Sequence, residues 1–270
     1  MVRNAQEPSA ADRSAETMAF VAPCRTLDRR APLRWLRLGW NDLQRAPGPS
    51  LSYGTVMAAV SWAVSLLAWK LGTLAMLLAL ASGFILLGPI LAIGLYSVSA
   101  QLAMGRRPYL GYCLVEGKRH LGNEMIFGFM LLIVFLVWAR AASMVHVFFP
   151  MEAHPPWRDL VTFLTIGSAV GAVFCAIVFS ASAFSLPMIM ERRVDTVTAV
   201  VTSVNAVLRN KGVMLLWAAL IGAAVAVGFA TLFVGLVVLL PVLGHATWHA
   251  YRETIDAAAW PVNEGQSPAA

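Results

Sequence analysis

Long apolar segments recur along the chain, and they constrain its fold more than any other feature of the sequence. Residues 51–69 and 160–190, for example, contain no charged side chain. About 20 predominantly apolar residues are enough for a helix to cross the roughly 30 Å hydrocarbon core of a bilayer. Only 13% of the residues are charged and 59% are apolar, whereas soluble domains have about 25% charged residues. The sequence therefore predicts an all-α integral membrane protein.

The number of membrane-spanning helices depends on the last apolar stretch, residues 213–251. A single helix there would be about 58 Å long and would give five spans, whereas a hairpin gives six. Cytoplasmic loops usually hold most of the lysines and arginines. With six spans, only Lys70 and Arg158 fall on the far side, and Arg140 lies within a span. Charge therefore favours six spans with both termini in the cytoplasm. The predicted spans are 51–69, 74–103, 125–149, 160–190, 213–228 and 231–251.

These spans divide into three units of the same design. The units cover roughly 33–107, 108–193 and 194–252, and each has an amphipathic segment followed by a pair of helices. The second span of each pair contains a proline, which kinks a helix and frees backbone groups that neighbouring helices can satisfy. The prolines are Pro89, Pro187 and Pro241. The predicted fold is thus six transmembrane helices in three repeats.

Two of the amphipathic segments, residues 33–45 and 195–209, have a clear helical period. In each, apolar residues recur at spacings of three and four, which places them on one helix face. Such a face either lies in the lipid headgroup layer or docks on protein, and both alternatives remain open. The apolar residues are Leu33, Leu36, Trp40 and Leu43 in the first segment, and Val197, Val201, Val204 and Leu208 in the second.

The two ends of the chain are polar. Residues 1–31 are mixed in charge and lack the apolar core of a signal peptide. Residues 256–270 are mostly small and polar, and segments of this kind cannot bury enough apolar surface to fold. Both are predicted to be disordered cytoplasmic tails, so the membrane domain covers residues 32–255.

Several short motifs carry a family resemblance. The most specific is GHATWHAYR, from Gly244 to Arg252, and others include Ser185-Leu-Pro-Met188 and Trp138-Ala-Arg140. On these motifs the chain resembles a bacterial integral membrane family of unknown function. Glu191 departs mildly from the pattern, because the family more often has aspartate before the arginine. The resemblance implies an envelope protein without a settled activity, and some relatives carry the label of a cytochrome c oxidase subunit.

Arg140 is the charged residue that lies well inside a predicted span. Intramembrane charges are costly and often mark functional sites. No acid lies within another predicted span to pair with it. We therefore expect Arg140 to bind a lipid-like or small anionic ligand, in a cavity shaped by the kinks at Pro89 and Pro241. The alternative is that its side chain extends to the headgroups of the far leaflet.

His245 and His249 are four residues apart and share one face of the predicted last helix. Two imidazoles at this spacing can hold a metal ion, and Glu253 is a possible third ligand. The alternative to a metal site is a structural role for this segment at the membrane interface, where Trp248 and Tyr251 are typical anchors.

The motifs of common enzyme classes are missing from the sequence. It has no Walker A loop, nucleophile elbow or HExxH motif. Its five histidines are too few and too scattered for the chemistry of a terminal oxidase. Basic residues flank the spans instead of forming a face for nucleic acid. The sequence therefore predicts a non-enzymatic protein with no cofactor.

Three functions remain open. The first is a multi-pass protein of the bacterial inner membrane that binds or moves a lipid-like or small anionic ligand. The second is a structural or assembly factor of an envelope membrane complex. The third is a metal- or haem-binding membrane protein that uses His245 and His249. Membrane lipids are the expected partners, with a further membrane protein or a second copy of the chain as a possible addition.

Overall fold

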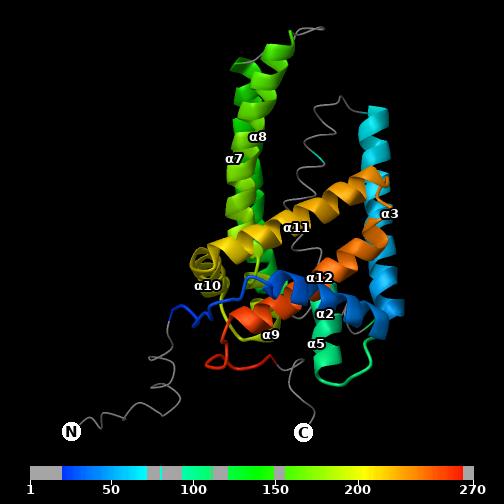
Figure 1. The fold of residues 1–270 in the computed structure, drawn as a ribbon, viewed down its shortest axis with the longest axis vertical. Helices are drawn as coiled ribbons and strands as arrows, with labels where there is room; N and C mark the ends of the chain where they lie inside the picture. Colours follow the sequence, from blue (N-terminus) through cyan, green and yellow to red (C-terminus); the bar gives the residue numbers. More distant parts are fainter. Residues whose placement is uncertain are drawn as a thin grey trace, which may run out of the picture.

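The computed structural model describes residues 20–71, 80, 93–109, 111, 121–148 and 156–263. These residues are mainly helical, and apart from two isolated β-bridges they form no β-structure. The helices are α2 (Ala31–Arg45), α3 (Pro47–Leu71), α5 (Ile93–Ala103), α7 (Leu121–Phe148), α8 (Trp157–Ser182), α9 (Ser185–Glu191), α10 (Thr196–Arg209), α11 (Lys211–Ala230) and α12 (Leu236–Thr254) (Figure 1).

Four stretches of the described helices are long and apolar enough to cross a membrane. They are Pro47–Leu67, Met125–Val145, Trp157–Glu191 and Lys211–Ala230. Most of their side chains face outward, and only 6% of the most apolar part of Trp157–Glu191 is buried. Outward-facing apolar side chains are what a lipid environment requires of a helix. Most of the predicted span 74–103 lies outside the described residues, which include its end as α5.

The last apolar stretch is a hairpin, so the alternative of one long helix is wrong. Helix α11 ends at Ala230 and α12 begins at Leu236. Between them, Leu232 and Phe233 have φ angles of 50° and 67°, in the left-handed region that a continuous helix excludes. The Phe233 N–H donates to Gly228 O at 2.7 Å, and the Trp62 indole donates to Leu232 O at 2.7 Å. Helix α12 is not among the four candidate spans.

The predicted span 160–190 is also divided. Helix α8 ends at Ser182, and α9 begins at Ser185. Pro187 has no backbone N–H and would interrupt a continuous helix. It is tolerated in the first turn of α9, because the N–H groups of a first turn have no partner within the helix. Ser203 of α10 fills the break: its hydroxyl accepts from the Phe184 N–H at 3.1 Å and donates to Ser180 O at 2.7 Å.

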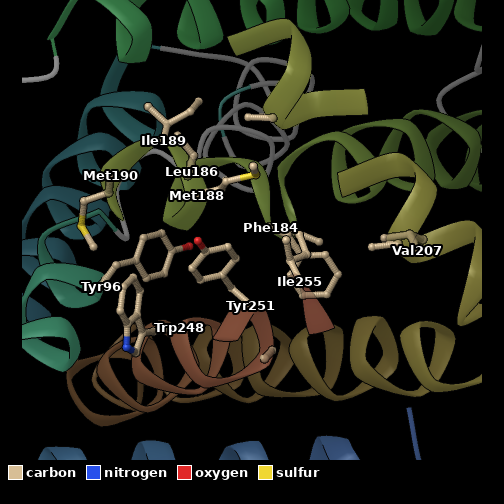
Figure 2. Close-up of a cluster of buried hydrophobic side chains, with 14 of the residues drawn as sticks. Tyr96, Phe184, Leu186, Met188, Ile189, Met190, Val207, Trp248, Tyr251 and Ile255 are labelled. Carbon is tan, nitrogen blue, oxygen red and sulfur yellow. The ribbon is translucent and has the colours of Figure 1, made fainter. Parts of the chain in front are cut away.

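The core lies where α5, α9 and α12 meet, and each of these helices contacts the other two. Tyr96 of α5, Met188 of α9 and Tyr251 of α12 are almost fully buried there, together with Trp248 (Figure 2). Because these helices come from the ends of the three predicted units, the three units meet in one core.

Helix α12 also holds α2 and α3 at close range. A Cβ atom added at Gly39 of α2 would lie 2.5 Å from the Val242 carbonyl oxygen. At Gly54 of α3, an added Cβ would collide with the Val237 carbonyl and lie 3.0 Å from Pro241 Cγ. These contacts require glycine, because any larger residue would separate the helices.

Parts of both chain ends pack against the bundle, which differs from the predicted disorder of 1–31 and 256–270. The Arg25 N–H donates to Thr254 O at 2.8 Å, and the Asp256 N–H donates to Pro23 O at 2.9 Å. Ala22 and Trp260 are buried. These buried apolar side chains and backbone hydrogen bonds attach residues 20–31 and 256–263 to the bundle. Residues 1–19 and 264–270 lie outside the described part of the chain.

Candidate functional site

The second half of α12 carries three polar side chains one helical turn apart. His245, His249 and Glu253 share a face because residues four apart lie above one another on a helix. This face lies toward α2 and the first turn of α3, so every one of the three has a partner outside its own helix. We call these residues and their partners the α12 polar face.

His245 is completely buried. Its Nε2 atom lies 2.9 Å from Ser50 Oγ, and its Nδ1 atom lies 2.8 Å from Ser99 Oγ. A neutral imidazole has one donor nitrogen and one acceptor nitrogen, and a hydroxyl group can complement either. The two serines therefore satisfy the ring in both tautomers and join α12 to α3 and α5.

His249 and Glu253 join α12 to α2. His249 Nε2 lies 2.8 Å from Asp42 Oδ2, and Asp42 is only 5% exposed. The Trp35 indole N–H donates to Glu253 Oε2 at 2.8 Å, and Arg34 forms an ion pair with the same carboxylate. Burial of a carboxylate is costly unless it is paired, so these contacts fix one register between the two helices.

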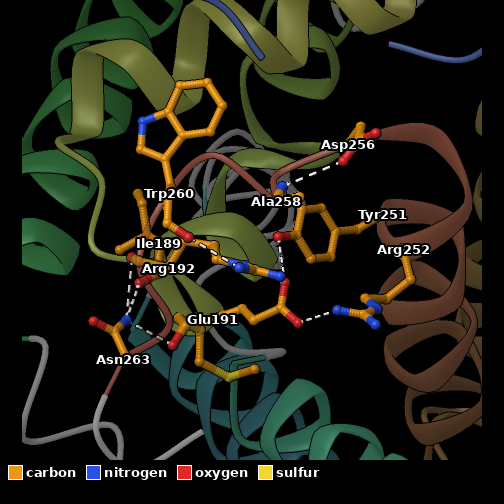
Figure 3. Close-up of polar contacts among 10 residues, drawn as sticks. Ile189, Glu191, Arg192, Tyr251, Arg252, Asp256, Ala258, Trp260 and Asn263 are labelled. Carbon is orange, nitrogen blue, oxygen red and sulfur yellow. Dashed lines mark hydrogen bonds and ion pairs between the residues drawn. The ribbon is translucent and has the colours of Figure 1, made fainter. Parts of the chain in front are cut away.

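A second polar cluster surrounds Glu191 at the end of α9. The Tyr251 hydroxyl donates to Glu191 Oε2 at 2.6 Å, and Arg252 forms an ion pair with the other carboxylate oxygen (Figure 3). The Arg192 guanidinium donates to Trp260 O at 2.9 Å, and the Asn263 amide donates to the Ile189 and Met190 carbonyls at 3.0 and 2.9 Å. The C-terminal segment thus caps α9.

The structure separates the residues predicted to form a ligand site. Arg140 is exposed on α7, which packs chiefly on α8. Pro241 is buried in α12 against Gly54 of α3. Pro89 lies outside the described residues. Arg140 and Pro241 therefore belong to different parts of the bundle.

His245 and His249 lie near each other as expected, but each ring faces its own partner. The nitrogens of His245 face two serine hydroxyls, and the carboxylate of Glu253 is paired with Arg34. Within the described ranges, no three His, Cys, Asp or Glu side chains are close enough together to hold a metal ion. A metal at this pair would require His245 to give up a serine hydrogen bond.

Sequence reasoning missed the partners of these residues. Ser50, Ser99 and Asp42 are ordinary polar residues in sequence, and nothing in their spacing connects them to a histidine far along the chain. The available signal was the i, i+4, i+8 pattern of His245, His249 and Glu253, which predicted a shared polar face but not what covers it.

The candidate spans and their outward apolar side chains define an integral membrane protein with several membrane-spanning helices. Residues 76–191 match the model of a family described as "Predicted integral membrane protein (DUF2189)". This match confirms the resemblance to an integral membrane family of unknown function, over a segment that ends before α10, α11 and α12. No curated protein and no solved structure is significantly similar to the chain.

Proposed function

We propose that the chain is a non-enzymatic, multi-pass protein of the bacterial inner membrane that binds or moves a lipid-like or small anionic ligand. Six spans in three units, with both termini in the cytoplasm, are part of this proposal. Arg140 is the charge partner of the ligand. Support for six spans comes from the α11–α12 hairpin and from the basic residues of the cytoplasmic loops.

The position of Arg140 carries the proposal. It lies in the candidate span Met125–Val145, five residues before its end, which is about 8 Å along a helix. Its side chain is exposed, and no acidic partner for it is found among the described residues. The neighbouring Leu136, Val137 and Met144 are exposed apolar residues.

An anion would stabilise an arginine in such surroundings. At the centre of a membrane helix, a charged side chain costs roughly 2.5–3.5 kcal/mol on insertion scales, and Arg140 lies between the centre and the end of its span. Charge-assisted bonds to a phosphate or carboxylate offset this cost, and the guanidinium group can bind such an anion through two parallel N–H donors. A lipid phosphate drawn toward the span, or a small anion, has the required chemistry.

The test is the lipid and anion content of the full-length protein purified in mild detergent, measured by native mass spectrometry. We expect wild type to retain an anionic ligand that Arg140→Leu loses. Arg158→Leu is the matched control, because Arg158 lies in the first turn of α8, 5.7 Å from the ring of Trp157. That variant removes an equal charge from the first turn of the candidate span Trp157–Glu191, at its end, and should retain the ligand.

A structural or assembly role is the second candidate, and one face of α8 favours it. A Cβ atom added at Gly167 or Gly171 would meet no atom within 4 Å. Ser168, Ala172 and Ala176 are exposed on the same helix. Small residues allow close approach of another membrane helix. If wild type and Arg140→Leu carry the same bulk lipid and both co-purify with another membrane protein, this second role is supported.

A further inference from the structure

Helix α10 buries several hydroxyl groups and exposes large apolar side chains. The buried side of the helix carries Thr198, Thr202 and Ser203 beside the core residues Ala199 and Ala206. Its apolar face points away from the protein, with Val197 52% exposed and Leu208 55% exposed. Water would favour the opposite arrangement, because exposed apolar surface is costly and hydroxyl groups are readily hydrated. An apolar environment would suit this face of α10 better than water does.

Helix α2 divides into three sectors. Trp35, Gly39 and Asp42 face α12 and are buried. Leu33 and Trp40 of the predicted apolar stripe are 58% and 46% exposed, whereas Leu36 and Leu43 of the same stripe pack on the protein. The remaining sector is polar and basic, with residues such as Arg37, Asn41 and Arg45. Docked, apolar and basic sectors on one helix are what a helix at a membrane surface needs, since it contacts protein, acyl chains and water at once.

Both helices lead directly into a candidate span. Only Ala46 separates α2 from α3, and only Asn210 separates α10 from α11. The exposed apolar faces therefore adjoin helices whose own apolar side chains face lipid. Exposed basic residues lie next to both faces: Arg37 lies on the basic sector one turn from Leu33, and Arg209 and Lys211 follow Leu208 in the sequence.

We propose that the exposed apolar faces of α2 and α10 bind anionic phospholipids at the membrane surface from which their spans enter. The apolar side chains contact the upper acyl chains, and Arg37, Arg209 and Lys211 bind the phosphates. An anionic lipid fits both parts of this surface, because it joins an apolar chain to a negative charge. This surface does not include Arg140, so it is separate from the ligand site proposed above.

The test uses the full-length chain with Cys24, Cys113 and Cys175 replaced and one new cysteine carrying a nitroxide label. The labelled positions are Val197→Cys, Leu208→Cys and Trp40→Cys, with Asn41→Cys as the control on the basic sector. In vesicles containing phosphatidylglycerol, collisions with oxygen report a lipid environment and collisions with a soluble nickel chelate report water. We expect the three apolar positions to favour oxygen and the control to favour nickel.

The proposal is overturned if labels at 197 and 208 meet the nickel chelate as readily as the label at 41. It is equally overturned if neither reagent reaches them, because another protein segment would then cover the face. A second measurement needs no variant: phosphatidylglycerol with a photoreactive acyl chain should cross-link wild-type peptides of α2 and α10. Arg209→Gln with Lys211→Gln should lower the cross-linking of α10 and leave that of α2 unchanged. Unchanged cross-linking of α10 would contradict the phosphate contacts, and an Arg140 variant should leave both helices labelled.

Discussion

At the scale of single residues, His245 is a buried polar side chain that joins three helices, α3, α5 and α12. It is fully buried and lies between the hydroxyl groups of Ser50 and Ser99. We expect His245→Ala to destabilise the protein by about 1–3 kcal/mol for the unsatisfied hydroxyl groups, with a further cost for the cavity. Ser99→Ala should cost less, because the imidazole keeps Ser50. The measurement is thermal unfolding in mild detergent followed by size-exclusion chromatography, and equal midpoints for His245→Ala and wild type would contradict this interpretation.

At the scale of elements, helix α10 depends on the cap that Asp195 provides. The Thr198 N–H donates to Asp195 Oδ1 at 2.9 Å. Burial raises the pKa of Asp195, but hydrogen bonds from Thr198 and nearby N–H groups outweigh burial, so the pKa lies below its ordinary value. A depressed pKa in the folded state adds stability above the unfolded pKa of about 3.9, and this stability is lost as pH falls through the folded value.

Asp195→Ala should therefore destabilise the protein by about 0.5–2 kcal/mol near neutral pH, the usual cost of removing an N-cap. The difference from wild type should shrink as the pH falls below about 4, because protonation weakens the same cap in wild type. Unfolding midpoints measured at neutral and acidic pH test this. Asp256→Ala is a control, since its carboxylate contacts Arg25 and accepts from the Ala258 N–H at 3.3 Å but caps no helix. A difference for Asp195→Ala that stays constant with pH would exclude a charge-dependent cap.

At the scale of the whole molecule, the sequence predicted the class of protein well. The apolar composition and the length of its segments depend directly on whether lipid or water surrounds them. A break after residue 228 followed from charge distribution, and the structure has it at residues 231–235. The shared face of His245, His249 and Glu253 followed from helical period. The partners of that face could not be predicted, because Asp42 and Ser99 reach it only through tertiary packing. The outward direction of Val197 and Leu208 was open for the same reason: periodicity shows that a face is apolar, not whether lipid or protein covers it.

Residues 256–263, which follow α12, pack against the bundle and contribute to its stability. Trp260 is buried, and the Asn263 side-chain amide donates hydrogen bonds to two carbonyl groups near the end of α9. Removing residues 256–270 should expose Glu191 and its partners to water and free the end of α9, so the folded yield should fall. Removing only 264–270 keeps Asn263 and is the matched control. Size-exclusion profiles of both truncated proteins in mild detergent measure the effect. If both behave like wild type, the core of α5, α9 and α12 is stable alone; if only the longer truncation aggregates, the C-terminal segment completes the core.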